Sequence, residues 1–462
     1  MALIQQAACP SHHRPHAAPV HHPGPQLRLP CHELAEHGMS IDNAYELISS
    51  DLLLDGQARL NLATFVTTWM PSTAARLMAD TANKNMIDKD EYPQTAELEV
   101  RCVSILADLW NSPEHEQATG CSTTGSSEAA MLAGLALKWR WRERMRAAGK
   151  PTDRPNLVMG ANVQVCWEKF CRYWDVEPRL VPMEGERYHL TADVAVTHCD
   201  ENTIGVVAIL GSTFDGSYEP VKEIAQALDQ LQAQRGLDIP LHVDAASGGF
   251  VAPFMAPELE WDFRIKRVQS INASGHKYGL VYPGVGWAIW RVKEALPDDL
   301  IFNVNYLGGN MPTFALNFSR PGAEVIAQYL MFASLGREGY RRVIGAAQDV
   351  ARFIADSIAK LGPYRLLSDG RDLPVFAFTL APEIENYTVF DVSDRLRQRG
   401  WLVPAYTFPE NRQDLSVLRI VVRAGMNFEM ADRLLEGLRE ETTFLQKLTA
   451  PIPGEQRKAF AH

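Results

Sequence analysis

The sequence predicts an α/β protein with a large domain, built on a mostly parallel sheet flanked by helices, and a small α/β domain at its C-terminus. The chain has 462 residues, which exceeds the usual size of one domain. Between residues 156 and 243, short apolar stretches alternate with stretches of helical periodicity. This pattern is typical of parallel sheets with helices on both faces. Polar residues follow several of the apolar stretches directly, at the strand ends where such sheets bind ligands.

The beginning of the chain has a different composition. Residues 1–30 are rich in histidine and proline and offer few apolar groups to bury, so we expect a mobile tail. The irregular spacing of its histidines disfavours a metal site there. Residues 41–54 have the periodicity of an amphipathic helix, which Ser40 can cap. We divide the chain into an N-terminal segment (1–59), a large domain (60–345) and a small domain with a terminal tail (346–462).

The elements between these boundaries follow from local periodicity. Apolar residues three and four positions apart predict helices, and short apolar runs between polar or small residues predict buried strands. A long helical pattern carries the chain into the small domain. The predicted helices are 97–110, 128–139, 165–173, 220–234 and 322–361, and the predicted strands are 156–159, 178–182, 203–210, 239–243, 268–271, 375–380 and 415–422.

Composition restricts the kind of partner and the compartment. The net charge of −11 and the pI near 5.7 argue against a broad nucleic-acid surface and favour a small-molecule partner. The basic residues between 138 and 150 are more simply explained as a solvated helix face than as a nucleic-acid or membrane site. Seven cysteines without a C-x-x-C pair, and the lack of a signal peptide or of an apolar run of about 18 residues, predict a cytoplasmic protein.

A lysine and an aspartate at two predicted strand ends indicate the chemistry. Lys277 follows a strand and a turn of small residues that includes Ser274 and Gly275. Asp244 ends another apolar strand upstream of it. A cofactor with a reactive aldehyde and a pyridine nitrogen needs a lysine for a Schiff base and a carboxylate for the ring nitrogen. The pair therefore suggests pyridoxal phosphate.

The cofactor's phosphate needs a site of its own. Gly125, Ser126 and Ser127 open an apolar helix, whose free N–H groups and hydroxyls suit a phosphate dianion. The alternative interpretation is a plain capping box, since small polar residues open many helices. Thr213 follows the strand 203–210 and is expected to lie at the same edge of the sheet.

Five segments, in one register, carry a family resemblance that extends from about Pro30 to the C-terminus. The chain resembles the pyridoxal-phosphate-dependent glutamate decarboxylases, members of the group II decarboxylases, in their bacterial and plant forms. The resemblance implies a fold-type I enzyme, similar to aspartate aminotransferase, with a seven-stranded sheet in the large domain. It also implies a homo-oligomer, at least a dimer and, in some members, a hexamer. The segments are Asn61–Phe65, Asn83–Asp88, Gly125–Ala129, His242–Gly249 and Ser274–Lys277.

The resemblance also assigns residues to roles. Gln164 and Ala246 are implied to lie on opposite faces of the cofactor ring, and Ser319 is implied to reach a phosphate across a dimer interface. The implied catalytic residues are Lys277, Asp244 and His276; the implied cofactor-binding residues are Lys277, Ser126, Ser127, Gln164, Thr213, Asp244, Ala246, Ser274, His276 and Ser319; and the implied substrate-binding residues are Thr64, Phe65, Asp88 and Arg419. No metal is implied.

Some of these assignments have alternatives. Asp88 could instead cap a helix within a structured loop, and Arg419 could form a structural ion pair rather than bind the substrate α-carboxylate. Glu168 stands where the bacterial enzymes have histidine, which puts the local proton network in doubt; we interpret it as a solvent-facing helix residue. His462 could plug the site at neutral pH, as a near-terminal histidine does in acid-resistance members, or belong to a disordered end.

The implied reaction is α-decarboxylation of L-glutamate to 4-aminobutyrate (GABA) and carbon dioxide by a carboxy-lyase. If Asp88 and the distal carboxylate of the substrate were both charged about 4 Å apart, they would repel by roughly 4 kcal/mol at an effective dielectric of ~20. One should hold a proton, so we expect activity to rise below neutral pH. The reaction consumes a proton, which is consistent with a role in acid resistance.

Two other functions are less consistent with the sequence. A decarboxylase for aspartate or cysteine sulfinate would need a shorter pocket, which Thr64, Phe65 and Asp88 do not favour. A catalytically inactive assembly homologue is disfavoured by the intact Lys277 and Asp244. The short C-terminus lacks the extension of the plant members, so no calmodulin partner is expected, and membrane association is expected only conditionally, through the N-terminal segment.

Overall fold

The computed structural model describes residues 28–305 and 311–449. The chain forms two compact units, of which one ends at Ala58 and the other begins at Arg59. In the first unit, α1 (Ile41–Leu52) begins after Ser40, whose hydroxyl accepts a hydrogen bond from the Asn43 amide at 3.3 Å. The predicted cap is therefore confirmed. The predictions for the histidine- and proline-rich tail lie outside the described residues, apart from its last few positions.

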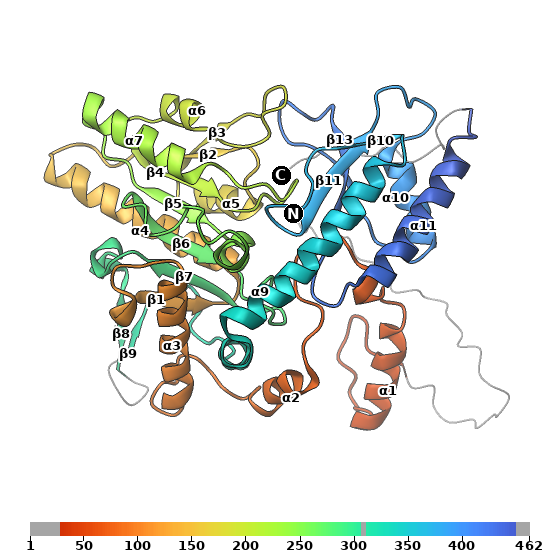
Figure 1. Cartoon of the computed structure of the whole chain (residues 1–462). Coiled ribbons are helices and arrows are strands. Elements are labelled where there is room, and N and C mark those ends of the chain that lie inside the picture. Colours follow the sequence, from red (N-terminus) through yellow and green to blue (C-terminus); the bar gives the residue numbers. More distant parts are fainter. Residues whose placement is uncertain (1–27, 306–310, 450–462) are drawn as a thin grey trace. The chain divides into compact units, whose positions relative to one another are not determined.

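The second unit contains a seven-stranded sheet with the strand order β1-β7-β6-β5-β4-β2-β3. The strands from β3 to β6 in this order are parallel, and β7 is antiparallel to both of its neighbours. The predicted mostly parallel, seven-stranded sheet is confirmed (Figure 1). Its strands are β1 (Thr119–Thr123), β2 (Asn156–Gly160), β3 (Glu177–Val181), β4 (Thr203–Ile209), β5 (Leu241–Asp244), β6 (Val268–Ala273) and β7 (Gly286–Trp290).

Helices cover both faces of this sheet because its central strands are apolar on both sides. Side chains alternate between the faces of a strand. Leu157 and Met159 of β2 therefore pack in the cluster that contains α4 and α5, whereas Val158 packs in the cluster that contains α6 and α7. The helices of this domain are α2 (Ser72–Asp80), α3 (Pro93–Leu109), α4 (Ser126–Ala147), α5 (Val165–Tyr173), α6 (Ala192–Thr197), α7 (Val221–Arg235) and α8 (Ala252–Met255), with short 3-10 turns at Ala58–Leu60, His115–Gln117, Gly248–Phe250, Lys293–Ala295 and Asp298–Leu300.

The long helix α9 (Ala323–Ala359) runs from the large sheet to a second, four-stranded sheet (Figure 1). It is interrupted at Gly336, which adopts a positive φ of 55°. The boundary predicted at 345/346 falls inside α9. The second sheet is antiparallel, with the order β10-β11-β13-β12, and has its own hydrophobic core. The remaining elements are β8 (Phe302–Val304), β9 (Met311–Thr313), β10 (Tyr364–Leu366), β11 (Val375–Leu380), α10 (Val389–Gln398), β12 (Ala405–Thr407), β13 (Ser416–Val421) and α11 (Phe428–Leu445).

One expectation needs correction. The helix predicted at 128–139 begins at Ser126 and continues to Ala147, because its basic second half still buries Trp141 and Met145. Within the ranges described above, no helix is both long and apolar enough to cross a membrane.

Candidate active site

A cavity of about 340 Å³ lies at the carboxyl ends of the parallel strands. The chain reaches it after β1, β2, β4, β5 and β6, as expected for a ligand site in a parallel sheet. Most of the residues predicted to bind the cofactor line this cavity. These are Ser126, Ser127, Gln164, Thr213, Asp244, Ala246, His276 and Lys277. The lining also includes Gly125 of the predicted phosphate site, together with Thr124, Glu128, Asn162, Cys166, Ile209, Gly211 and Ser247, for which no role was predicted.

Lys277 follows β6 and reaches into the cavity. Its Nζ donates a hydrogen bond to Ser247 Oγ at 3.3 Å and lies 5.3 Å from the centre of the Phe65 ring. Burial lowers the pKa of the Lys277 amine, and the nearby Arg419 cation lowers it further, while Asp244 acts in the opposite direction. A lowered pKa increases the fraction of Lys277 that is present as the neutral, nucleophilic amine. The environment of Lys277 therefore suits covalent bond formation with an aldehyde.

Asp244 is held by three N–H donors at the end of β5. Its Oδ1 accepts from the Asn272 side chain at 3.0 Å and from the Ala246 amide at 3.1 Å, and its Oδ2 accepts from Trp167 Nε1 at 2.8 Å. A carboxylate oxygen can accept more than one hydrogen bond. Oδ2, which accepts a single bond, thus retains room for one further donor.

His242, a neutral histidine on β5, holds the side chain of Asn272 in place. His242 Nε2 lies 2.7 Å from Asn272 Oδ1, and Nδ1 lies 2.8 Å from Ser270 Oγ. An amide oxygen only accepts, so Nε2 donates and Nδ1 accepts the serine hydroxyl. Burial lowers the pKa of His242 to about 4, which keeps the ring uncharged. His242 therefore orients Asn272 without competing with the cofactor for the charge of Asp244.

Asn272 and Trp167 contact Asp244 but were not among the predicted site residues. Asn272 could have been found, because β5 and β6 are parallel and place His242 opposite Ser270 and Asp244 opposite Asn272. All four positions share one face by the two-residue period of strands. Trp167, on α5, has no comparable signal, because it is distant from Asp244 in sequence and looks like an ordinary core residue.

The N-terminus of α4 forms the other end of the cavity. Gly125 is the N-cap residue and contributes no side-chain cap, so a plain capping box is wrong. The first N–H groups of the helix, at its positive end, have no capping side chain. Ser274 does not line the cavity but donates a hydrogen bond to Ser126 Oγ at 2.6 Å. This terminus is suited to a phosphate group.

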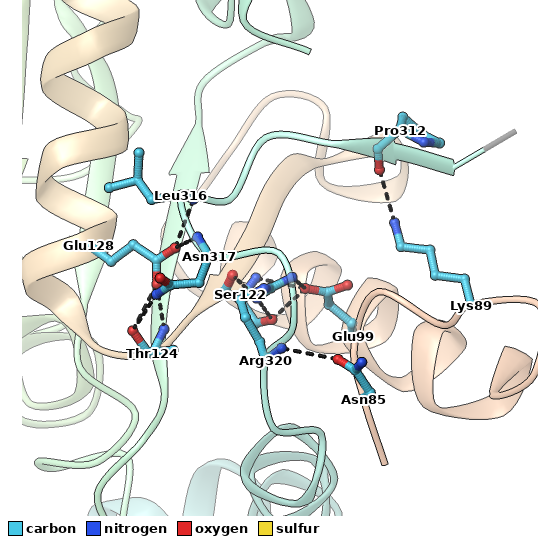
Figure 2. A network of polar contacts seen from close by, with 10 residues as sticks. All are labelled: Asn85, Lys89, Glu99, Ser122, Thr124, Glu128, Pro312, Leu316, Asn317 and Arg320. Atoms are coloured by element: carbon cyan, nitrogen blue, oxygen red, sulfur yellow. Dashed lines mark hydrogen bonds and ion pairs between the residues drawn. The ribbon is translucent and has the colours of Figure 1, made fainter. Parts of the chain in front are cut away.

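Glu128 fixes the turn that precedes α4. Its Oε2 accepts from the Thr124 amide at 2.8 Å and from the Thr124 hydroxyl at 2.9 Å. Its Oε1 accepts from the amides of Leu316 and Asn317 at 3.0 and 3.4 Å (Figure 2). The buried carboxylate of Glu128 thereby connects the turn before α4 to the segment that carries Ser319.

Pyridoxal phosphate fits these groups. It needs an amine, a carboxylate for the ring nitrogen and a phosphate site, and the cavity provides Lys277, the open position on Asp244 Oδ2 and the uncapped N-terminus of α4. His276 lies against Gly125, where an added Cβ would come within 3.0 Å of its ring. Burial lowers the pKa of His276 to about 4, with Lys277 adding to the effect.

Two of the predicted substrate-binding residues lie beside Lys277. The Phe65 ring is 4.8 Å from the Arg419 guanidinium and 5.3 Å from Lys277 Nζ. Arg419 donates to the backbone carbonyls of Thr213 and, at 2.7 Å, Ala63. It forms no ion pair within the described part of the chain, so the alternative of a structural ion pair is wrong. Thr64, next to Phe65, accepts from the Val66 amide at 3.1 Å.

Asp88 and Ser319 do not line this cavity. Asn85 lies between their segments: its side chain donates to Ser319 Oγ at 3.3 Å, and its carbonyl accepts from the Asp88 amide at 3.2 Å. The Asn85 side chain also accepts from the Arg320 amide at 3.0 Å (Figure 2). Asp88 is not a helix cap, because α3 begins after Tyr92. Within one subunit, Asp88 and Ser319 therefore lie outside the cavity that contains Lys277.

One of the two departures from the family pattern, Glu168, can be placed. Glu168 is partly exposed in the first turn of α5 and is not among the lining residues, so it does not face the cavity. His462 lies outside the described residues. Across residues 28–305 and 311–449, no group of three or more histidine, cysteine or acidic side chains is arranged to hold a metal ion.

Glu219 is a buried carboxylate next to the cavity and should make stability depend on pH. It accepts from the Leu190 and Ile209 amides at 2.8 and 2.6 Å and from Asn162 at 2.9 Å. Burial raises its pKa to about 7. The folded state therefore binds the proton more tightly than the unfolded chain, whose carboxyl has a pKa near 4.5. This difference adds about 3 kcal/mol to the free energy of unfolding at low pH, and the contribution is lost as the pH rises from about 4.5 through about 7.

Glu219→Gln mimics the protonated form, so we expect the difference in unfolding free energy between variant and wild type to shift in favour of the variant by about 3 kcal/mol between pH 4.5 and 7.5. Denaturant unfolding at both pH values measures it. The matched control is Glu223→Gln, an exposed carboxylate on α7, which should show no such shift. A pH-independent difference for Glu219→Gln would contradict the expectation.

Comparisons with known proteins agree with this site. Residues 36–381 match the pyridoxal-dependent decarboxylase conserved domain. A glutamate decarboxylase of Aliivibrio fischeri is 55% identical over 423 residues, 91% of each chain, and glutamate decarboxylase 5 of Arabidopsis thaliana is 50% identical over 88% of this chain and 83% of its own.

A solved structure agrees as well. The glutamate decarboxylase of Lactobacillus brevis superposes with a TM-score of 0.88 at 47% identity, covering 91% of this chain and 96% of that one. The recognition of the family, the fold type and the cofactor are confirmed by these matches. The chain belongs to the pyridoxal-dependent decarboxylase family, and within it to the glutamate decarboxylases, with pyridoxal phosphate as its cofactor.

Proposed function

We propose that this decarboxylase removes the α-carboxylate of L-glutamate and releases 4-aminobutyrate and carbon dioxide. The observation that carries the proposal is the convergence of Lys277, Asp244 and the N-terminus of α4 on one cavity, with Arg419 and Phe65 beside the lysine. The relatives named above are glutamate decarboxylases, which supports the choice of substrate.

The bound cofactor supplies an aldehyde that captures an amine and a ring that accepts electrons as carbon dioxide leaves. Lys277 would hold the cofactor through its aldehyde. Asp244 would keep a proton on the ring nitrogen through Oδ2, which accepts one hydrogen bond, from Trp167, within the described chain. The first N–H groups of α4, with Ser126 and Ser127, would hold the phosphate.

Arg419 is the cation next to the reacting amine. It is almost fully buried, and its Nε has no hydrogen-bond partner within the described chain. A buried guanidinium without a carboxylate is costly unless an anion joins it. Binding of the substrate α-carboxylate by Arg419 removes this cost and places the α-carbon near Lys277.

A second copy of the chain completes the site in this proposal. Asp88 and Ser319 lie outside the cavity of their own subunit, on segments joined through Asn85. In this proposal Asp88 and Ser319 act in the cavity of a neighbouring subunit, whereas Phe65 and Arg419 lie beside Lys277 of their own subunit. We infer at least a homodimer, in which Thr64, Phe65 and the neighbour's Asp88 segment surround the distal carboxylate.

Asp88 then determines the pH of action. Two carboxylates about 4 Å apart repel by roughly 4 kcal/mol at an effective dielectric of ~20, so the complex takes up a proton on binding. We expect kcat/KM of the wild type to rise below neutral pH, consistent with an acid-response role. Asp88→Asn removes one charge and should keep activity to higher pH.

The pH profile of kcat/KM for L-glutamate measures this effect. Asp90→Asn, an exposed neighbour in the same loop, is the matched control and should leave the profile unchanged. An Asp88→Asn profile identical to that of the wild type would remove Asp88 from the substrate site.

The substrate is tested by carbon dioxide release from L-glutamate, L-aspartate and cysteine sulfinate by cofactor-loaded protein between pH 4 and 8. Release from L-glutamate alone supports the proposal. Release from a shorter acid, with L-glutamate inert, would keep the cofactor and refute the substrate. The cytoplasmic location, the conditional membrane association and the plugging role of His462 stay predictions.

A further inference from the structure

A second cavity lies at the opposite edge of the large sheet. It has a volume of about 330 Å³ and is lined by Arg140 and Arg144 of α4, by Asp238, and by Lys266, Arg267 and Gln269 at the start of β6. The active-site lysine follows the other end of β6. Ser126 and Arg144 are 18 positions apart on α4, which corresponds to about 27 Å at 1.5 Å per residue. The two cavities are therefore distinct.

The charges around this cavity are unbalanced. Four cations, Arg140, Arg144, Lys266 and Arg267, face two carboxylates, Asp229 and Asp238. Both carboxylates are bound to Arg267, at 2.6 and 3.2 Å. Within the described chain, the other three cations form no ion pair. This excess of positive charge occurs in a protein whose net charge is −11.

Arg140 has the clearest need for an anion. Its half-buried guanidinium donates to the neutral Gln269 Oε1 at 2.9 Å. Burial lowers the pKa of Arg140, Asp238 acts in the opposite direction, and the like charge of Arg144 lowers it further. Arg144 donates to the backbone carbonyl of Asp238 at 2.8 Å, again an uncharged acceptor. Two guanidinium groups that repel each other beside a cavity are stabilised when an anion lies between them.

We propose that this cavity binds a small multivalent oxyanion of the phosphate type, with Arg140, Arg144 and Lys266 as its ligands. The planar guanidinium groups match the spacing of oxyanion oxygens and can each donate two hydrogen bonds, and the lysine adds a point charge. The cavity, at about 330 Å³, has room for such a ligand and is open to solvent. The site is independent of the decarboxylation reaction and of the substrate assigned to it.

The test uses the cofactor-loaded enzyme, in which the cofactor's own phosphate occupies the active site. Inorganic phosphate is titrated at pH 7.5, and binding is followed by calorimetry and by the rise in Tm, with sodium chloride at equal ionic strength as the reference. We expect saturable binding of one phosphate per chain. Arg140→Gln/Lys266→Gln should weaken this binding at least about tenfold, because it removes two of the three cationic ligands of the anion.

The matched control is Lys169→Gln/Arg172→Gln, which removes the same charge from exposed positions on α5 and should retain wild-type binding. Equal Tm shifts in phosphate and chloride, or undiminished binding in the Arg140→Gln/Lys266→Gln variant, would overturn the site. If that variant does not fold, the exposed Arg144→Gln takes its place, and the absence of saturable phosphate binding to the wild type overturns the site by itself.

Discussion

Lys277→Ala is expected to lose at least about a thousandfold in kcat for L-glutamate, since it removes both the covalent anchor of the cofactor and a group positioned for proton transfer. The side chain makes one hydrogen bond, to Ser247, so its loss should leave the fold intact. Borohydride reduction followed by intact-mass measurement tests the anchor directly. The wild type should gain the mass of one reduced cofactor, and the variant should gain none.

The control for this experiment is Lys169→Ala, which removes an exposed lysine of α5 and should change neither the labelling nor kcat. Full labelling of Lys277→Ala would move the anchor to another lysine. Full labelling together with unchanged turnover would remove the lysine from the mechanism altogether. Neither outcome would alter the fold assignment, which rests on the sheet and on the solved structure it matches.

The main features of the active site could be predicted because they depend on local patterns. Apolar runs followed by polar residues indicated the carboxyl ends of strands, and parallel strands bring these ends to one edge. Thr213, Asp244 and Lys277 were placed together on this basis, and the structure shows them lining one cavity. The phosphate site at the N-terminus of α4 was predicted from Gly125, Ser126 and Ser127, and the structure excludes the capping box that was the alternative.

The rest depends on contacts that local patterns do not encode. Trp167 approaches Asp244 through the packing of α5 on the sheet, and Arg419 reaches Phe65 through the docking of the small domain. Asp88 and Ser319 acquire their proposed roles only in an oligomer, so no pattern within one chain predicts where they act. The C-terminal end of α4 also differs from the prediction, because burial of Trp141 and Met145 extends the helix beyond its apolar half.

Asp244→Ala is expected to lower kcat at least about a thousandfold while the cofactor stays attached to Lys277, because the carboxylate acts on the ring nitrogen and not on the aldehyde. Without the carboxylate the ring nitrogen loses its proton, and the neutral ring accepts electrons poorly. Absorbance of the bound cofactor and turnover of L-glutamate, measured on the same sample, separate the two roles. Loss of the cofactor along with activity would show that Asp244 serves binding alone.

Trp167→Phe tests the hydrogen bond to Asp244 while the carboxylate of Asp244 stays in place. It removes the 2.8 Å donor to Asp244 Oδ2 and keeps an aromatic ring in the core. A hydrogen bond to a charged group contributes about 1.5–3 kcal/mol, so we expect a loss of roughly ten- to a hundredfold in kcat.

A cofactor methylated on its ring nitrogen carries a permanent positive charge and should restore part of the activity of Asp244→Ala. If it does not, the carboxylate must do more than hold a proton on the ring, and its bonds to Asn272 and Trp167 would then serve to aim it at the substrate.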